Sequence, residues 1–290
     1  MFTQLIFWPW FTGLTILVIG LVAVRRELPA ARGLDKLVVL GRVFMAAPLA
    51  LFGAEHLSGA RFIMPIVPPW MPVRLFWTYF VGVALIAAAL SIVLMRQVRL
   101  SATLLGIMFF LFVAMIHLPN ALAKPGDRIL WTVALREIAF GGGAWALAGT
   151  QTRQWRVSGT HWMIVVGRVC IAVVAIFFAV EHFLHPEFVP GVPLGKRMPA
   201  WFPLRVAWVY LTGVALLAAG AAMLANKQAR LAATWLGLLI TLLVLCIYVP
   251  ILAVAGQPDL IEALNYVADT MLFGGTVLVL AAALPKDHAS

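Results

Sequence analysis

The sequence is short of charge. Only 11% of its 290 residues are Asp, Glu, Lys or Arg, whereas a soluble domain has roughly 25%. Hydrophobic residues make up 63% of the chain, and the mean hydropathy is +1.01. This composition excludes a soluble globule and predicts a membrane protein whose apolar segments of about 20 residues cross the bilayer as helices. Open sheets are excluded because lipid offers no hydrogen-bond partner to an unpaired backbone.

Cysteine is almost absent as well. Cys170 and Cys246 are the only two, each lies inside an apolar segment, and the chain has no C-x-x-C motif. We therefore expect neither a structural disulfide nor dithiol chemistry from this chain. The sequence also lacks a Gly-rich phosphate loop, a Ser-His-Asp set and an H-E-x-x-H motif, so the common catalytic signatures are missing.

The dominant feature that is present is a series of nine apolar segments, each long enough to span a bilayer. We expect the first to be a retained anchor rather than a signal peptide, because no basic region precedes it and Arg25 and Arg26 follow it. The fold class predicted is an all-α, polytopic helical membrane protein. The spans are roughly 5–24, 37–57, 74–95, 100–121, 129–149, 162–184, 204–225, 231–252 and 262–284.

The basic residues are distributed unevenly between the two sides that these spans define. With the N-terminus outside, 13 of the 21 Lys and Arg residues fall on the inner side with three acids, and the outer side has eight of each sign. This positive-inside bias predicts a cytoplasmic (inner) membrane protein with its N-terminus outside and its C-terminus inside. The net charge of +10 then serves orientation and contact with anionic lipid, and we expect no nucleic-acid partner.

Two stretches of the sequence resemble each other. Residues 41–57, GRVFMAAPLALFGAEHL, and 167–183, GRVCIAVVAIFFAVEHF, share seven of 17 positions, including the Gly-Arg and Glu-His ends. From Trp70 to Pro119, 22 of 50 positions match the segment 131 residues later without a gap. The offset is 126 residues at the Glu-His pair, so the second copy has five extra residues in its outer loop.

The repeat predicts how the chain is organised. Each copy has four spans, so both copies enter the membrane from the same side and form a parallel repeat. The domains expected are a leading helix and basic loop (1–36), a first four-helix repeat (37–150), an inner linker (151–161) and a second four-helix repeat (162–285). The small residues of FGGGAWALAG and ALLAAGAA fit close packing between helices.

The first outer loop of each copy is rich in proline and aromatic residues. Proline denies these segments a continuous helix, so we expect each to fold as a broken cap over the outer mouth of its bundle. Trp70 and Trp201 mark the two caps. They suit either an anchor at the level of the lipid headgroups or a lid over a site, and the sequence leaves both interpretations open.

Ionisable residues within the spans lie mostly at one depth, near the outer side. Charged groups in lipid are costly, so these side chains should face inward and pair. They serve either as clamps of the bundle or as a site for a ligand or a proton. The predicted polar layer consists of Glu55, His56, Arg74, His117, Arg136 and Glu137 in the first copy, and Glu181, His182, Arg205, Tyr248 and Asp269 in the second.

A more specific prediction concerns the two glutamates. We expect Glu55 to meet Arg74 or Arg136 and Glu181 to meet Arg205, because an inward carboxylate needs a partner. The histidine beside each glutamate should face the cap, since adjacent helical residues point about 100° apart.

Metal and haem sites are weaker interpretations of the same residues. His182 and His185 are three residues apart beside Glu181, but Pro186 ends that helix at once, so we expect no zinc site. A bis-histidine haem between His56 and His117 has no counterpart in the second copy, and we expect no bound cofactor of that kind.

The Glu-His ends, the Trp-x-Pro loops and the W-x-Y-x-x-G helices together resemble the DoxX-like membrane family, which includes DoxD-type and MauE-type relatives. The resemblance covers about 41–149 and 167–284, as a tandem form with an added leading helix. It implies a four-helix unit and a quinone-proximal or accessory role in a redox system. It supplies no catalytic residue for this chain.

The function expected is therefore that of a membrane component of a redox or quinone-linked process, an accessory subunit rather than a stand-alone enzyme. It would have no cofactor of its own and would offer an outer-leaflet polar site to a quinone-like or small anionic ligand. A membrane or extracytoplasmic redox protein is the expected partner besides the lipid bilayer. A membrane scaffold or assembly factor, and a small-molecule permease, are the alternatives.

Overall fold

The computed structural model describes residues 2–151, 161–257 and 259–286. It is all-helical, with 79% of its residues in helices. Over the described ranges the only β pairing is an isolated bridge between Phe188 and Arg197. Among the described residues, eight helices are long and apolar enough to cross a membrane, as the composition predicts for a polytopic helical membrane protein. Most of the predicted linker at 151–161 lies outside the described residues.

The chain begins with one helix and then runs twice through a similar series. The leading helix is α1 (Phe2–Val24). The first series is α2 (Asp35–Ser58), α3 (Ala60–Ile63), the 3-10 turn η1 (Met64–Ile66), α4 (Arg74–Leu94), α5 (Val98–Phe112), the π-turn η2 (Val113–His117), α6 (Leu118–Ala123) and α7 (Arg128–Gly149). The second series is α8 (His161–Leu184), α9 (Arg205–Leu224), α10 (Ala229–Leu243), the π-turn η3 (Val244–Tyr248), α11 (Val249–Val254) and α12 (Leu260–Ala283).

The two π-turns fall at matching places. Both interrupt the third long helix of a series, and η3 begins 131 residues after η2, which is the offset of the sequence repeat. A π-turn inserts one residue into an α-helix and is frequent at functional sites. Here it ends each time on the residue predicted for the polar layer, His117 in the first series and Tyr248 in the second.

The predicted span at 129–149 forms a regular helix but differs in character from the others. It is α7, which has 22 residues and is not among the eight helices that qualify as membrane spans by length and composition. Arg136, Glu137 and three consecutive glycines lower its hydropathy. Much of α7 is nevertheless buried, because α5, α8 and α12 pack around it.

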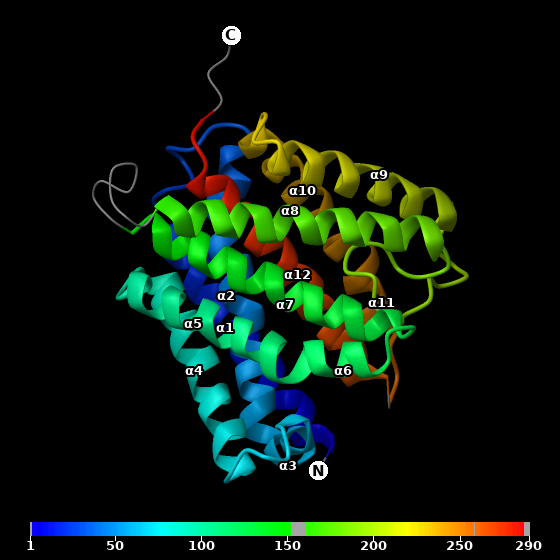
Figure 1. The fold of residues 1–290 in the computed structure, drawn as a ribbon. Coiled ribbons are helices and arrows are strands. Elements are labelled where there is room, and N and C mark those ends of the chain that lie inside the picture. The colour runs from blue at the N-terminus through cyan, green and yellow to red at the C-terminus, as the bar shows by residue number, and fades with distance from the viewer. Residues whose placement is uncertain (1, 152–160, 258, 287–290) are drawn as a thin grey trace.

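The helices do not separate into two independent bundles. α12, from the second series, packs along α2 of the first, and α7, from the first series, packs along α8 of the second. α7 and α12 also pack against each other, near the centre of the molecule in Figure 1. The fourth helix of each series therefore completes the other half, whereas the sequence repeat predicted two self-contained four-helix units.

Glycines permit these exchanged contacts. A Cβ atom on Gly167 of α8 would lie 2.3 Å from the carbonyl oxygen of Gly142 on α7, and one on Gly275 of α12 would lie 2.4 Å from the backbone nitrogen of Met45 on α2. Both distances are shorter than any van der Waals contact, so no larger residue fits with the backbones this close. The small residues of the repeat thus serve packing between the halves.

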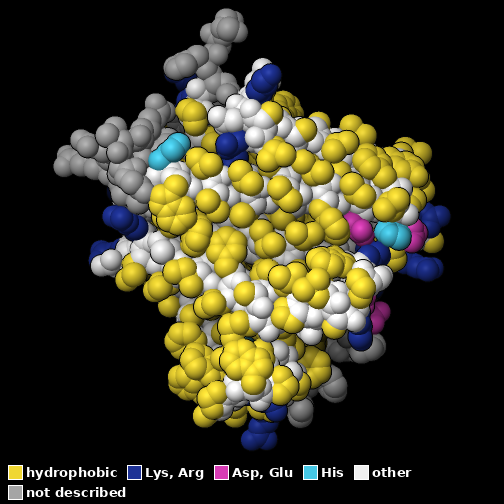
Figure 2. Space-filling model, viewed as in Figure 1, with side chains coloured by type: hydrophobic (Ala, Val, Ile, Leu, Met, Phe, Trp, Pro, Cys, Tyr) yellow, Lys and Arg dark blue, Asp and Glu magenta, His cyan; other side chains and the backbone are white. Residues whose placement is uncertain are grey.

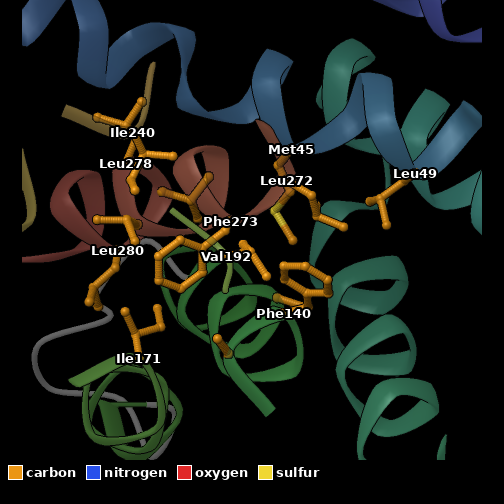
Figure 3. Close-up of a cluster of buried hydrophobic side chains, with 14 of the residues drawn as sticks. Met45, Leu49, Phe140, Ile171, Val192, Ile240, Leu272, Phe273, Leu278 and Leu280 are labelled. Atoms are coloured by element: carbon orange, nitrogen blue, oxygen red, sulfur yellow. The ribbon is translucent and has the colours of Figure 1, made fainter. Parts of the chain in front are cut away.

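The core and the surface are both apolar. Met45, Phe140, Ile171 and Phe273 are packed in the centre of the molecule (Figure 3). Hydrophobic side chains cover most of the face shown in Figure 2, and Lys and Arg lie mainly around its rim. This arrangement suits a molecule surrounded by lipid, where an apolar exterior has no cost.

Charged residues at the predicted inner end tie the helices together. Arg42 pairs with Glu27 at 2.5 Å, and Asp35 pairs with both Arg230 at 2.7 Å and Lys286 at 2.8 Å. The Asp35 contacts join the start of α2 to the start of α10 and to the chain beyond α12. These pairs fix the end of the molecule opposite the predicted site.

Candidate functional site

The first half contains a large cavity, about 1030 Å³ in volume, between α2, α4, α5, α7 and α12. The loop at 59–73 lies at its mouth, on the side predicted to be outer, where Phe62, Ile63 and Val67 line it. Because α12 forms one wall, the site is assembled from both halves of the chain. Pockets that bind small organic molecules have volumes of about 300–1,000 Å³, so the space is sufficient for an amphiphile of that size.

The polar end of the cavity gathers most of the residues predicted for the first polar layer. Arg74 is the exception. It is half-buried at the first turn of α4 and does not line the cavity. Asn265 and Asp269 of α12 join the group instead. The polar side chains at this end are Glu55, His56, His117, Arg136, Glu137, Asn265 and Asp269.

Arg136 is bound by two carboxylates. One guanidinium nitrogen donates a short hydrogen bond to Asp269, and Nε lies 3.6 Å from Oε1 of Glu137. The prediction that Asp269 belongs to the polar layer of the second copy is wrong. The exchange of α7 and α12 brings it to Arg136, so the ion pair joins the two halves inside the molecule.

Glu55 has no arginine partner in the described part of the chain, which contradicts the prediction of a contact with Arg74 or Arg136. It lies beside Asn265 and within electrostatic range of Asp269. Glu55, Glu137 and Asp269 thus face the cavity together with a single guanidinium. Three carboxyl groups therefore share one arginine at the polar end.

His56 presents a defined face to the cavity. Its Nδ1 donates a hydrogen bond to the carbonyl oxygen of Phe52, one turn earlier in α2, at 2.8 Å. A carbonyl oxygen can only accept, so Nδ1 carries the proton, and in the neutral ring Nε2 is an acceptor.

The rest of the cavity is apolar and extends between α4 and α5. Phe80 and Ala88 of α4 line it opposite Leu104 and Met108 of α5, and its far end reaches Ser101. Phe80 and Leu104 are also exposed on the outer surface of the molecule. The cavity therefore opens sideways, toward the space that lipid would occupy.

In the second half the corresponding space is filled by the chain itself. The loop at 185–204 is five residues longer than the loop at 59–73. Its segment 189–194 is buried throughout, and Val192 points into the core near Phe140 and Phe273 (Figure 3). We call residues 189–194 the plug.

The plug is held by the second-copy counterparts of His56 and His117. Nδ1 of His182 donates to the carbonyl oxygen of Phe178 at 2.5 Å, and Nε2 accepts the backbone N–H of Gly191 at 2.9 Å. The hydroxyl of Tyr248 donates to the carbonyl oxygen of Pro190 at 2.9 Å. The predicted contact between this histidine and the cap is confirmed in the second half.

Arg128 also forms hydrogen bonds to the plug. At the start of α7, it donates to the carbonyl oxygens of Pro193 at 2.9 Å and Leu194 at 3.0 Å, and it pairs with Glu181 at 3.3 Å. The prediction that Glu181 meets Arg205 is wrong, since Arg205 is exposed. Sequence reasoning missed Arg128 because it searched for partners within each copy, and Arg128 belongs to the other one.

The two tryptophans chosen as caps lie outside both sites. Trp70 is 69% exposed and Trp201 is 54% exposed. Neither closes a cavity, so their position favours the anchor at the lipid headgroups over the lid.

No metal site is found in the described ranges, where no group of three or more His, Cys, Asp or Glu side chains is placed to hold an ion. His182 faces the plug, and His185 lies 3.9 Å from Glu187 near the surface. His56 and His117 do line one cavity.

Comparison with known proteins gives one match. Residues 45–140 are similar to a family described as a domain of unknown function, DUF8561. The matched region runs from α2 to α7 and includes Glu55, His56, His117, Arg136 and Glu137, but not the wall that α12 supplies. Neither a curated protein nor a solved structure matches the chain.

Proposed function

We propose that this protein is an integral membrane component of a redox or quinone-linked process, and that its first cavity binds a quinone-like amphiphile. The observation that carries the proposal is the form of the cavity, which has a cluster of polar groups at one end and an apolar channel open toward lipid. A ring with polar substituents would lie at the polar end, and a hydrocarbon tail would lie between α4 and α5. The resemblance to the DoxX-like family points to the same ligand class.

The proposed architecture has nine membrane spans, with α7 as the ninth. The leading helix would be followed by two parallel four-helix repeats that exchange their fourth helices. The matching order of elements in the two series supports the repeat. The excess of Lys and Arg supports a cytoplasmic membrane location with the N-terminus outside and the C-terminus inside.

The other functions expected from the sequence fit the cavity less well. A pure scaffold predicts a polar layer that is fully paired and leaves no space. The residues around the plug come nearer to this description, since His182, Tyr248 and Arg128 bond it, but the first half keeps an open cavity. A permease needs a polar path through the inner half, where the cavity is apolar apart from Ser101. A small anion would meet three carboxylates and an arginine that is already paired.

A matched pair of variants tests the proposal. Ala84 lines the cavity, and Ala215 is its counterpart 131 residues later. We expect purified protein to bind a decyl-tailed benzoquinone, measured by quenching of tryptophan fluorescence. Ala84→Phe should weaken binding at least about tenfold, because the ring fills the channel, and Ala215→Phe should change it less than about twofold.

Two results would count against this function. One is the absence of bound quinone both in organic extracts of the purified protein and in the titration. The other is an equal effect of Ala84→Phe and Ala215→Phe, which would place the quinone outside the first cavity.

A further inference from the structure

The plug indicates which chemistry the open cavity recognises. In the second half, backbone groups of residues 189–194 occupy the place that a ligand would take in the first. Gly191 donates to His182, and Tyr248 donates to Pro190. The plug is thus a peptide held where the first half has an open space, and its contacts show the hydrogen-bonding roles of the residues around it.

We infer that the plug is a built-in counterpart of the ligand, and that the first cavity selects a membrane amphiphile whose head group donates a hydroxyl hydrogen bond to Nε2 of His56. This inference rests on the proposed function, since it concerns the ligand of the same cavity. It adds the direction of the hydrogen bond, and with it a preference for the reduced, hydroxyl-bearing form of a quinone-like ring.

The first support is the equivalence of the two histidines. His56 and His182 occupy matching positions, and each donates from Nδ1 to the carbonyl oxygen one turn earlier, that of Phe52 or Phe178. This bond leaves Nε2 as the acceptor in both neutral rings. In the second half Nε2 is observed accepting an N–H, so the corresponding atom of His56, which lines the cavity, can accept a hydrogen bond from a ligand.

The second support is a pair of unsatisfied acceptors that line the same cavity as His56. Among buried side-chain atoms of the described residues, Oε2 of Glu137 and Oδ1 of Asn265 are acceptors without a hydrogen-bond partner. The nearby guanidinium of Arg136 is already held by Asp269, and its unbonded Nε lies 3.6 Å from Glu137. A head group with only carbonyl oxygens would leave these two acceptors unsatisfied, whereas hydroxyl groups can donate to them.

The expected size of the preference for the hydroxyl-bearing form follows from the gain of one hydrogen bond. A net hydrogen bond together with an avoided unsatisfied acceptor corresponds to roughly tenfold in affinity. We therefore expect a decyl-tailed benzoquinol to bind the full-length protein about tenfold more tightly than the benzoquinone with the same tail. A pair without redox chemistry, 4-decylphenol and its methyl ether, should differ in the same direction.

The experiment compares these probes on the parent, His56→Leu and His56→Gln in detergent, with tryptophan fluorescence as the readout and anaerobic buffer for the quinol. The preference should fall below about twofold in His56→Leu, which has no acceptor. It should be partly retained in His56→Gln, whose side-chain oxygen accepts. Retention of the full preference in His56→Leu would overturn the inference.

If His56→Leu does not fold, titration of the parent protein alone still tests the inference. Equal binding of quinol and quinone, or tighter binding of the quinone, refutes the hydroxyl donor while leaving the quinone-like ligand in place. Binding of neither form refutes the proposed function itself, and the inference with it. The two failures are therefore distinguishable in one titration.

Discussion

Among single residues, the ion pair between Arg136 and Asp269 has the widest structural role. Sequence reasoning selected both because ionisable groups are rare in apolar spans, and it placed them in polar layers at one depth. It assigned them to different bundles, and it gave Glu55 and Glu181 the wrong partners. A sequence shows that ionisable residues are rare in the spans and at which depth they lie. It does not show which of them pair, because pairing depends on which helices pack together. Several arginines lie near the outer ends of the helices, so each glutamate had more than one possible partner.

Removing one partner of this pair should be strongly destabilising. Arg136→Leu leaves Asp269 and Glu137 as buried carboxylates without a cation, and we expect a loss of about 3–5 kcal/mol in the free energy of unfolding. The measurement is denaturant-induced unfolding in mixed micelles. Lys196→Met is the control, because its pair with Glu262 is long, at 4.0 Å, and solvent-accessible, and such pairs contribute at most about 1 kcal/mol. Similar losses for both variants would contradict a buried role for Arg136.

At the level of single elements, the plug and the π-turns distinguish the two halves. The sequence predicted a loop five residues longer in the second copy and a broken cap over each mouth. It did not predict that the longer loop folds inward. The length of a loop limits its reach, but burial of the plug also requires a cavity of matching shape, and that cavity exists only once α7 and α12 are in place.

The hydrogen bond that Tyr248 donates to the plug should contribute measurably to the stability of the protein. Tyr248→Phe keeps the ring but leaves the buried carbonyl of Pro190 without its donor, and we expect a loss of about 1–3 kcal/mol in unfolding free energy. Tyr210→Phe serves as the control, because Tyr210 is 42% exposed and should change stability by less than about 0.5 kcal/mol. Equal behaviour of the two variants in thermal unfolding would argue that the plug is not held by this bond.

The crossing of α7 and α8 should not tolerate a large side chain. Gly142→Leu would place its Cβ 2.8 Å from Cβ of Cys170, and such overpacking costs about 1–3 kcal/mol or separates the helices. Gly126→Leu, at a position where a Cβ meets nothing within 4 Å, provides the comparison. We expect the first variant alone to lower the yield of monodisperse protein and its melting temperature. An unchanged Gly142→Leu would mean that the two helices are farther apart.

For the molecule as a whole, the exchange of fourth helices is the main feature that sequence reasoning missed. The helical class, the series of apolar segments and the close packing at small residues were all predicted from composition and pattern. The exchange was not, because a glycine-rich face such as that of α7 can pack equally well against a helix of its own half or of the other half. Only the complete set of contacts decides between the two arrangements.

The orientation of the whole chain gives a separate prediction. If the positive-inside bias sets the topology, reporter fusions after Gly33 and at Ser290 should both report a cytoplasmic location. A fusion within the loop at 59–73 should report the opposite side and serves as the internal control. An external signal at either cytoplasmic position would contradict nine spans with the N-terminus outside.

The contact between α2 and α12 also determines when this protein can finish folding during synthesis. α2 is synthesised well before α12, so the surface it buries against α12 stays uncovered until α12 has been translated. During that interval this face of α2 must be occupied by lipid or by an insertion chaperone. A nonsense mutation anywhere before Leu260 would leave the first cavity without the wall that α12 forms, so truncated chains should be recognised and degraded by membrane quality control.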